Sequence, residues 1–280
     1  MNKNPIVALG ANVYECDSDT VIVVVHGASE GSSRYIQFAT LFSQHYNVIT
    51  YNHPGHETSQ AVDFGVEQIL ERSIQIIEFA QSNYKKCIIF AHSMGSVVIR
   101  NILEAVNPDT KIILSGAPVL TTFDRISSYA ALGLLTFLPQ NAVSSKLNYL
   151  TFDQKSSKVG LDNKAWVCSD AKVVNEYLTD QVSNFPFTNK SLKSLLKMTL
   201  VANRKNIYQT LANYQLFLVS GLTDGFTGNG KHYQFILNYA TKANHRIYPN
   251  SFHEVHNDID KMQLYKDIIK FIEGNIDGEN

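Results

Sequence analysis

Five consecutive β-branched residues, from Val21 to Val25, constrain the fold of this chain more than any other feature. A strand with one face in water alternates apolar and polar side chains, whereas a continuous apolar run indicates burial on both faces. Such strands are typical of parallel sheets with helices packed on both sides. The sequence therefore predicts an α/β fold built of βαβ units, with further strand-like runs at 47–51, 87–90, 111–115, 215–220 and 245–248.

The strand–helix alternation stops between about Pro118 and Leu211, where helix-like segments and polar loops, such as the one expected at 153–162, replace strands. It resumes at Gln215, and the last amphipathic helix spans about 259–272. We therefore expect an α/β core of residues 1–117 and 212–280, interrupted by a helical cap insertion of residues 118–211. At the N-terminus we expect residues 6–9 and 13–16 to pair as a short hairpin.

Composition excludes several classes of partner and location. A formal net charge of −1 gives no electrostatic basis for binding nucleic acid. The three cysteines are widely spaced and fit neither a disulfide framework nor a zinc site, which favours a reducing compartment. No apolar run approaches the roughly 20 residues of a spanning helix, and the N-terminus lacks a signal-peptide core. We expect a cytoplasmic protein.

The segment Ala91-His92-Ser93-Met94-Gly95 joins a predicted strand to a predicted helix. A serine on such a turn is a nucleophile elbow, in which a strained backbone lifts the hydroxyl clear of the chain. Crowding at the turn admits only small residues at positions 91 and 95. Ser93 is therefore a candidate nucleophile, although serine is also a favoured N-cap and could simply cap the helix.

A serine hydroxyl needs a base, and the base needs a carboxylate to orient it. Ligands bind at the carboxyl ends of parallel strands, and loops at that edge would carry Ser93, Asp224 and His253. Their order along the chain is that of the α/β-hydrolases. The backbone N–H groups of Ala28 and Met94 would form the oxyanion hole.

Each of these residues has a plainer interpretation. Asp224 could be a turn residue beside Gly225. His256 competes with His253 as the base, and would otherwise be a surface residue. Glu254 is interpreted as an anchor of the histidine loop, and the His26 side chain as structural.

Several histidines could suggest a metal. The zincin motif H-E-x-x-H nevertheless fails at His253, because position 257 is Asn. His53 and His56 lack further ligands nearby in the sequence. We expect neither a metal nor a cofactor.

Several motifs, in order along the chain, resemble those of the monoglyceride lipase and lysophospholipase group of α/β-hydrolases. The chain differs from that group's pattern at Gly31, Asn52 and Glu57, where the group has His, Asp and Gly. The resemblance covers about residues 19–271 and supports His253 as the base. The matching segments are 26–35 (HGASEGSSRY), 51–59 (YNHPGHETS), 220–224 (SGLTD), His253-Glu254-x-x-Asn257, and the cap residues Trp166, Ser169, Asp170, Tyr177, Asp180 and 185–188 (FPFT).

The resemblance implies a serine carboxylester hydrolase acting on single-chain lipid esters such as monoacylglycerol or lysophospholipid, with the cap as the acyl-binding wall. A peptidase or thioesterase would use the same triad. An inactive hydrolase fold that only binds ligands is a further alternative. The apolar stretch from Tyr129 to Leu138 would contact acyl chains or a membrane surface, or would pack in the core. The oligomeric state is left open.

Overall fold

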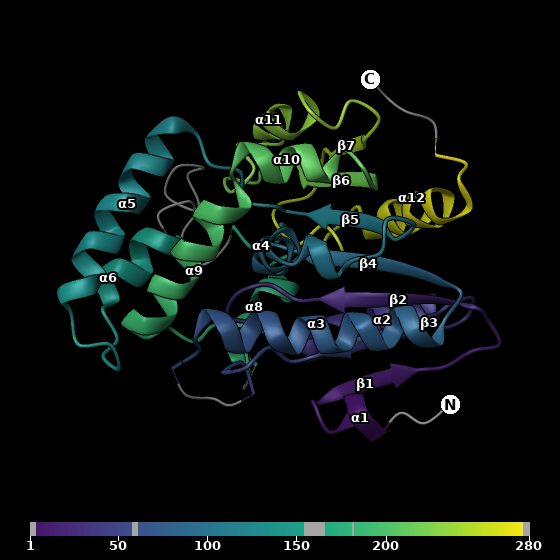
Figure 1. Ribbon diagram of the computed structural model, residues 1–280, viewed down its shortest axis with the longest axis horizontal. Coiled ribbons are helices and arrows are strands. Elements are labelled where there is room, and N and C mark those ends of the chain that lie inside the picture. The colour runs from purple at the N-terminus through teal and green to yellow at the C-terminus, as the bar shows by residue number, and fades with distance from the viewer. Residues whose placement is uncertain (1–3, 58–60, 154–165, 181, 277–280) are drawn as a thin grey trace.

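The computed structural model describes residues 4–57, 61–153, 166–180 and 182–276. Its centre is a seven-stranded sheet in the order β1-β3-β2-β4-β5-β6-β7. Only β1 runs antiparallel to its neighbour; the other neighbouring strands are parallel (Figure 1). The strands are β1 (Ala11–Tyr14), β2 (Thr20–Val25), β3 (Asn47–Tyr51), β4 (Lys86–His92), β5 (Lys111–Ser115), β6 (Gln215–Gly221) and β7 (Asn244–Tyr248).

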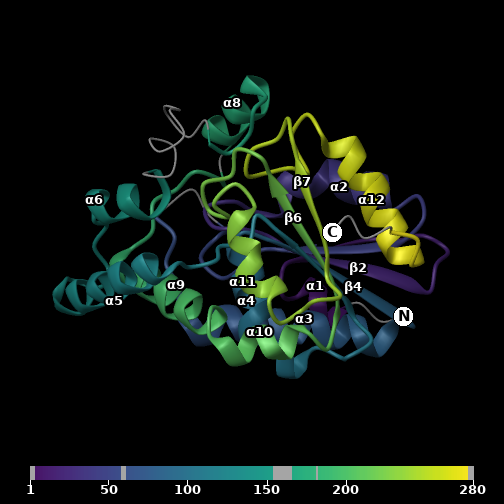
Figure 2. The same ribbon diagram turned by 90° about the horizontal axis from the view of Figure 1, so that it is seen from above.

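Helices cover both faces of the sheet, as Figure 2 shows from above. The helices α3, α4, α10 and α11 pack on one face, and α2 and α12 pack on the other. In the core the helical elements are α1 (Asn4–Val7), η1 (Ser32–Tyr35), α2 (Ile36–Phe42), α3 (Val66–Asn83), α4 (Met94–Asn101), η2 (Leu103–Ala105), α10 (Lys205–Leu211), η4 (Lys231–Tyr233), α11 (Gln234–Leu237) and α12 (Lys261–Glu273).

Strand β2 confirms the double burial inferred from its sequence. All six of its residues are buried. Val21, Val23 and Val25 join the hydrophobic cluster beneath α3, whereas Ile22 and Val24 join the cluster beneath α2 and α12. Because successive side chains of a strand point to opposite faces, a run without polar residues fills both clusters at once.

The predicted N-terminal hairpin is wrong. Residues 4–7 form the short helix α1, and Ala11–Tyr14 pairs antiparallel with β3 instead, with Ala11 opposite Tyr51. Gly10 turns the chain between them at a φ of 76°. Burial explains the outcome, because Ile6 reaches the main core from the helix and is 1 % exposed.

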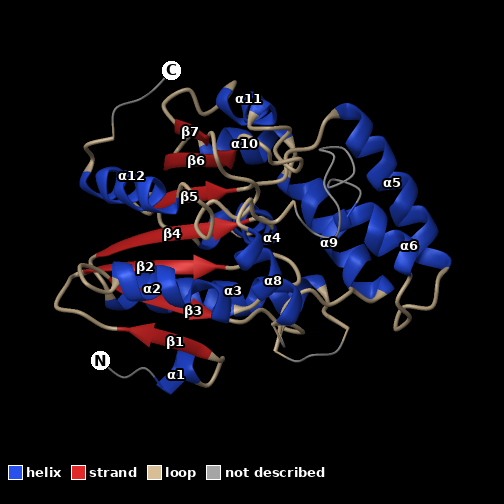
Figure 3. Ribbon diagram, turned by 180° about the vertical axis from the view of Figure 1, so that it is seen from behind, coloured by secondary structure: helices blue, strands red, loops and turns tan. Residues whose placement is uncertain are grey.

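The helical insertion covers the carboxyl edge of the parallel strands (Figure 3). Its described elements are α5 (Thr122–Phe137), α6 (Ser145–Asn148), the π-helical η3 (Tyr149–Asp153), α8 (Ala171–Thr179) and α9 (Asn189–Ala202). Helix α9 packs against both α5 and α4 and so links the cap to the core. Most of the polar loop expected at 153–162 lies outside the described residues. Among the described helices, none is long and apolar enough to cross a membrane.

Candidate active site

Ser93 stands at the junction of β4 and α4 with a φ of 48° and a ψ of −115°. A positive φ is strained for any residue with a side chain, and such strain occurs at functional sites. Gly95 shows why the turn is tight, since a Cβ there would lie 2.1 Å from the Val25 carbonyl oxygen. The expected crowding at position 95 is therefore present.

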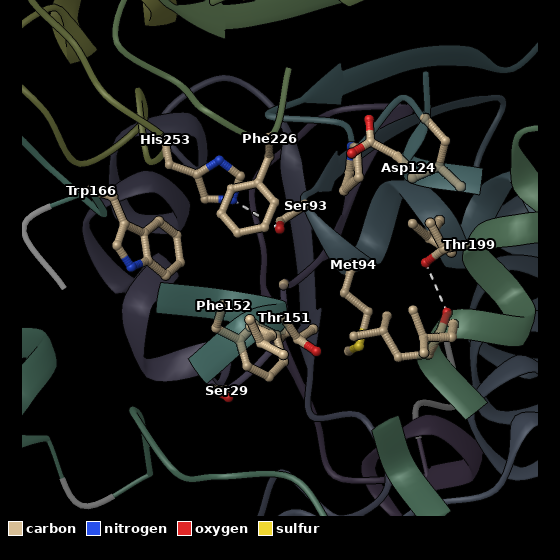
Figure 4. A pocket seen from close by; sticks show the side chains of 18 of the residues that line it. Ser29, Ser93, Met94, Asp124, Thr151, Phe152, Trp166, Thr199, Phe226 and His253 are labelled. Atoms are coloured by element: carbon tan, nitrogen blue, oxygen red, sulfur yellow. Dashed lines mark hydrogen bonds between the residues drawn. The ribbon is translucent and has the colours of Figure 1, made fainter. Parts of the chain in front are cut away.

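The Ser93 hydroxyl does not cap α4, although the residue occupies the N-cap position. Its Oγ instead lies 2.9 Å from Nε2 of His253 (Figure 4). The structure therefore favours a nucleophile–base pair over the capping alternative.

Asp224 and His253 approach each other on loops that leave β6 and β7. Oδ2 of Asp224 lies 3.1 Å from Nδ1 of His253, and Oδ1 accepts a 2.9 Å hydrogen bond from the Phe226 N–H. The Oδ2–Nδ1 pair is within ion-pair distance but is not aligned as a hydrogen bond, and neither atom has a hydrogen-bond partner within the described residues. The Asp224 side chain is fully buried, so its carboxylate faces the imidazole away from water.

Aromatic rings hold the His253 imidazole in place. The ring centroid of Phe226 lies 4.7 Å from that of His253. The ring centroid of Trp166, a residue of the insertion, lies 5.3 Å from that of His253. Sequence patterns predict no role at the base for either ring. The signals were slight: Phe226 is two residues from Asp224, and Trp166 is the single tryptophan of the chain.

His256 is fully buried, which corrects the expectation of a surface residue. It stacks on Tyr35 with ring centroids 4.7 Å apart and an interplanar angle of 8°. Burial and the nearby Arg34 guanidinium hold the pKa of His256 well below its usual value. Of the two candidate bases, the structure brings only His253 to within hydrogen-bond distance of Ser93.

Ala28 and Met94 line the same cavity as Ser93. Within the described part of the chain, neither backbone N–H has a hydrogen-bond partner. Unpaired N–H groups beside a nucleophile are the donors that an oxyanion needs.

The loop that carries Ala28 is fixed from two sides. The N–H of Gly27 donates to the buried Glu30 carboxylate, which also accepts from the Tyr35 hydroxyl at 2.8 Å. On the other side, Ser29 Oγ donates to the Phe185 carbonyl of the insertion at 2.8 Å. Burial and the nearby Glu254 carboxylate raise the pKa of Glu30 to about 8.

Glu254 and His26 have structural contacts of the kind that the sequence suggested. Glu254 forms an ion pair with Arg34 at 2.5 Å, and its backbone N–H donates to the Val167 carbonyl at 2.8 Å. The Nε2 of His26 accepts a 2.9 Å hydrogen bond from the His53 N–H.

Within the described ranges, no group of three or more His, Cys, Asp or Glu side chains could hold a metal ion.

A cavity of about 420 Å³ opens beside Ser93, and its far wall comes from the insertion. Hydroxyl groups on this wall donate to carbonyls of their own helices: Ser128 to Asp124 at 2.7 Å, and Thr199 to Leu195 at 2.8 Å. Their donors are therefore not offered to a ligand. Apolar side chains supply much of the wall, among them Phe123, Ala131, Leu147, Leu150, Leu195 and Leu196.

A parallel sheet with a strained serine after its fourth strand, and a histidine and an acid after later strands, defines an α/β-hydrolase. Residues 17–260 match the sequence model of the hydrolase family described as serine aminopeptidase, S33, and the chain belongs to this family. The fold and the family expected from the sequence are both confirmed.

Solved structures with the same fold include several lipolytic enzymes. A thermostable carboxyl esterase from Bacillus coagulans has a TM-score of 0.84 at 21 % identity, covering 95 % of this chain and 94 % of its own. A lipase in an open form has a TM-score of 0.81 at 20 % identity, with coverage of 95 % and 94 %. A monoglyceride lipase from Saccharomyces cerevisiae has a TM-score of 0.72 at 14 % identity, with coverage of 95 % and 92 %. No curated protein matches the chain.

Proposed function

We propose that this protein is a serine carboxylester hydrolase that cleaves single-chain lipid esters such as monoacylglycerol or lysophospholipid. One observation carries the proposal: the Ser93 hydroxyl, 2.9 Å from His253, lies at the wall of an apolar cavity. A cavity of about 420 Å³ is within the usual range for small-molecule sites. The esterase and lipase folds that resemble this chain support the ester-hydrolysing class.

In the proposed reaction, His253 Nε2 takes the proton of Ser93 as its Oγ attacks the ester carbonyl carbon. The imidazolium that forms is stabilised by Asp224, and the N–H groups of Ala28 and Met94 hold the oxyanion. His253 then protonates the departing alcohol, which leaves an acyl-enzyme on Ser93. Water, deprotonated by His253, attacks this ester and releases the fatty acid and the free serine hydroxyl.

The cavity explains why we favour a single acyl chain. Aliphatic and aromatic side chains of α5, α6, η3 and α9 surround it, and burying each methylene of a chain contributes about 0.8 kcal/mol. An apolar wall cannot compensate for the buried polar amides of a long peptide.

We also propose that the protein is cytoplasmic, because its three cysteines are free thiols.

An aminopeptidase is the second candidate, favoured by two carboxylates in the same cavity. Glu30 and Glu254 both line it near Ser93, and a carboxylate is a suitable partner for a substrate's terminal amine. Two facts weigh against this function: Glu254 is already paired with Arg34, and the pKa of Glu30 is raised to about 8, which leaves it mostly uncharged at neutral pH.

A substrate panel distinguishes these functions. Wild type and Ser93→Ala are compared on short-chain esters, monoacylglycerols, lysophosphatidylcholine, acyl thioesters and aminoacyl amides, and separate samples of both are labelled with a fluorophosphonate probe. We expect Ser93-dependent labelling and fastest turnover of the single-chain lipid esters. Turnover of aminoacyl amides alone would replace the lipid-ester proposal by the aminopeptidase. Absence of a Ser93-dependent adduct would favour a ligand-binding protein.

A further inference from the structure

Arg100 is a cationic side chain buried inside the protein. Its side chain is 0 % exposed, and it lies in the last turn of α4, the helix that begins after Ser93. Charged side chains are almost never fully buried unless they are paired with an opposite charge. Across residues 4–57, 61–153, 166–180 and 182–276, however, Arg100 forms no ion pair with a carboxylate.

Main-chain carbonyls take the place of a counter-ion. Nε donates to the Ser96 carbonyl at 3.0 Å, one terminal nitrogen donates to Ala202 at 3.4 Å, and the other donates to Pro118 at 2.9 Å. The last nitrogen also lies 3.4 Å from the Ser96 hydroxyl, which itself donates to the Ser93 carbonyl at 2.6 Å. The guanidinium thus contacts three separate segments of chain.

Two of those segments lie where the chain enters and leaves the cap. Pro118 lies where the chain leaves β5 for α5, and Ala202 is the last residue of α9. The next residue, Asn203, is also fully buried and contacts the same segment around Pro118. Its side-chain oxygen accepts from the Leu120 N–H at 2.9 Å, and its amide group lies 3.4 Å from the Pro118 carbonyl. Arg100 and Asn203 therefore bind the entry and the exit of the insertion together.

Only arginine suits this position. Its planar fork offers five donors in fixed directions, whereas lysine has one nitrogen and methionine has no donor. A fully buried charge is costly unless every donor is satisfied, so an apolar side chain would be the simpler filler of this volume. What an apolar side chain cannot do is hold the Pro118 and Ala202 carbonyls in one place.

We propose that Arg100 is a positioning residue that sets how the cap helices α5 and α9 lie over the cavity, and thereby the preference for long acyl chains. This inference rests on the proposed ester hydrolysis. Both helices supply the cavity wall distant from the core, through side chains such as Phe123 and Leu195. A short acyl group needs only the region near Ser93, whereas a long one needs the wall that Arg100 positions.

The test compares Arg100→Met, Arg100→Lys and wild type on p-nitrophenyl esters from acetate to dodecanoate. Arg100→Met keeps an unbranched apolar stem without donors, and Arg100→Lys keeps the charge without the fork. We expect kcat/KM for dodecanoate to fall at least tenfold, mainly through KM, while kcat/KM for acetate stays within threefold of wild type. Arg100→Lys serves if Arg100→Met does not fold.

Tyr214→Phe is the matched control, because the single O–H of Tyr214 also lies within hydrogen-bond distance of two main-chain carbonyls, those of Leu103 and Val106, but only within the core. It should lose stability without changing the chain-length profile. An equal loss for all esters in the Arg100 variants, or no loss, would overturn the role assigned to Arg100.

Hydrogen exchange separates failure of this inference from failure of the proposed function. If wild type hydrolyses no ester, the proposed function fails, but Arg100 can still be tested. We then expect faster amide exchange in the first turn of α5 and the last turn of α9 in the Arg100 variants, with the sheet unchanged. Unchanged exchange at both helix ends would show that Arg100 does not position the cap.

Discussion

At the scale of single residues, the strained turn at Ser93 depends on Gly95. A methyl group at that position would overlap the Val25 carbonyl, which lies in the sheet and cannot move away. We expect Gly95→Ala to lower the free energy of unfolding by about 3 kcal/mol, because overpacking against backbone forces the turn open. Urea denaturation and turnover of a short-chain ester measure the two effects.

Gly133 provides the matched control for that substitution. A Cβ added there meets nothing within 4 Å, and the residue lies inside α5. Gly133→Ala should stabilise the protein by up to about 1 kcal/mol, since alanine is the better helix former. If both alanine variants behaved alike, crowding at the turn would not be the reason for glycine at position 95.

The role proposed for Asp224 is also a property of one residue. Asp224→Asn keeps the shape of the side chain but removes the charge that faces Nδ1 of His253. We expect kcat to fall by about 10³ to 10⁴, because the imidazole loses the partner that fixes its tautomer. Circular dichroism should show an unchanged fold. A variant that kept a tenth or more of the wild-type kcat would exclude Asp224 as the orienting acid.

At the scale of secondary-structure elements, α5 presents an exposed apolar stripe, and one of its residues, Phe123, also lines the cavity. Its side chains are exposed by 52 % to 88 %: Phe123, Ile126, Tyr129, Leu134 and Phe137. The helical spacing places most of them on one side of the helix. We propose that this stripe contacts the lipid surface from which the substrate is drawn.

Replacing Phe123 and Phe137 by serine tests the contact. We expect several-fold slower hydrolysis of monoacylglycerol presented in vesicles, and weaker sedimentation with those vesicles, because apolar area is removed. Because Phe123 also lines the cavity, a Phe137→Ser single variant separates membrane contact from substrate binding. Ile36→Ser is the control, since Ile36 is 54 % exposed on α2. Equal vesicle binding by all variants would refute a membrane role for α5.

At the scale of the whole molecule, buried histidines make stability depend on pH. Burial holds the pKa values of five of them below the usual 6.5, and that of His56 is lowered to about 4. The other four are His26, His53, His92 and His256. Such groups stay neutral in the folded protein while the unfolded chain takes up protons. Their contribution to stability is therefore complete above pH 6.5 and is lost as the pH falls toward 4.

Urea denaturation at pH values from about 7.5 to 5 measures the effect. Each neutral histidine contributes a slope of up to about 1.4 kcal/mol per pH unit. Glu30 acts in the opposite sense, because its raised pKa lets the folded state bind a proton as the pH falls below about 8. His256→Phe should reduce the acid slope without breaking a hydrogen bond, since neither ring nitrogen has a partner in the described structure. A flat profile would contradict this account.

Local patterns were enough to predict most strands and the fold class. The β-branched run of β2 and the alternation of strands with helices follow from which faces must be buried. The order of apolar and polar residues along the sequence shows which faces these are. Motif order likewise identified Ser93, Asp224 and His253 as candidates. The prediction of an N-terminal hairpin failed because β1 pairs with β3, which lies more than thirty residues further along the chain. The spacing of apolar residues carries no information about which two strands will pair.

Contacts between distant segments were decided by the tertiary structure alone. Spacing could not show that Ser93 faces His253 rather than capping its helix, nor that His256 is buried against Tyr35. Nor could spacing assign a role to Arg100, which in the sequence is an ordinary cation near a helix end. Its contacts with the Pro118 and Ala202 carbonyls exist only in the folded chain. Sequence periodicity determines which side of an element is buried, whereas the partner across the core is selected by packing of the whole chain.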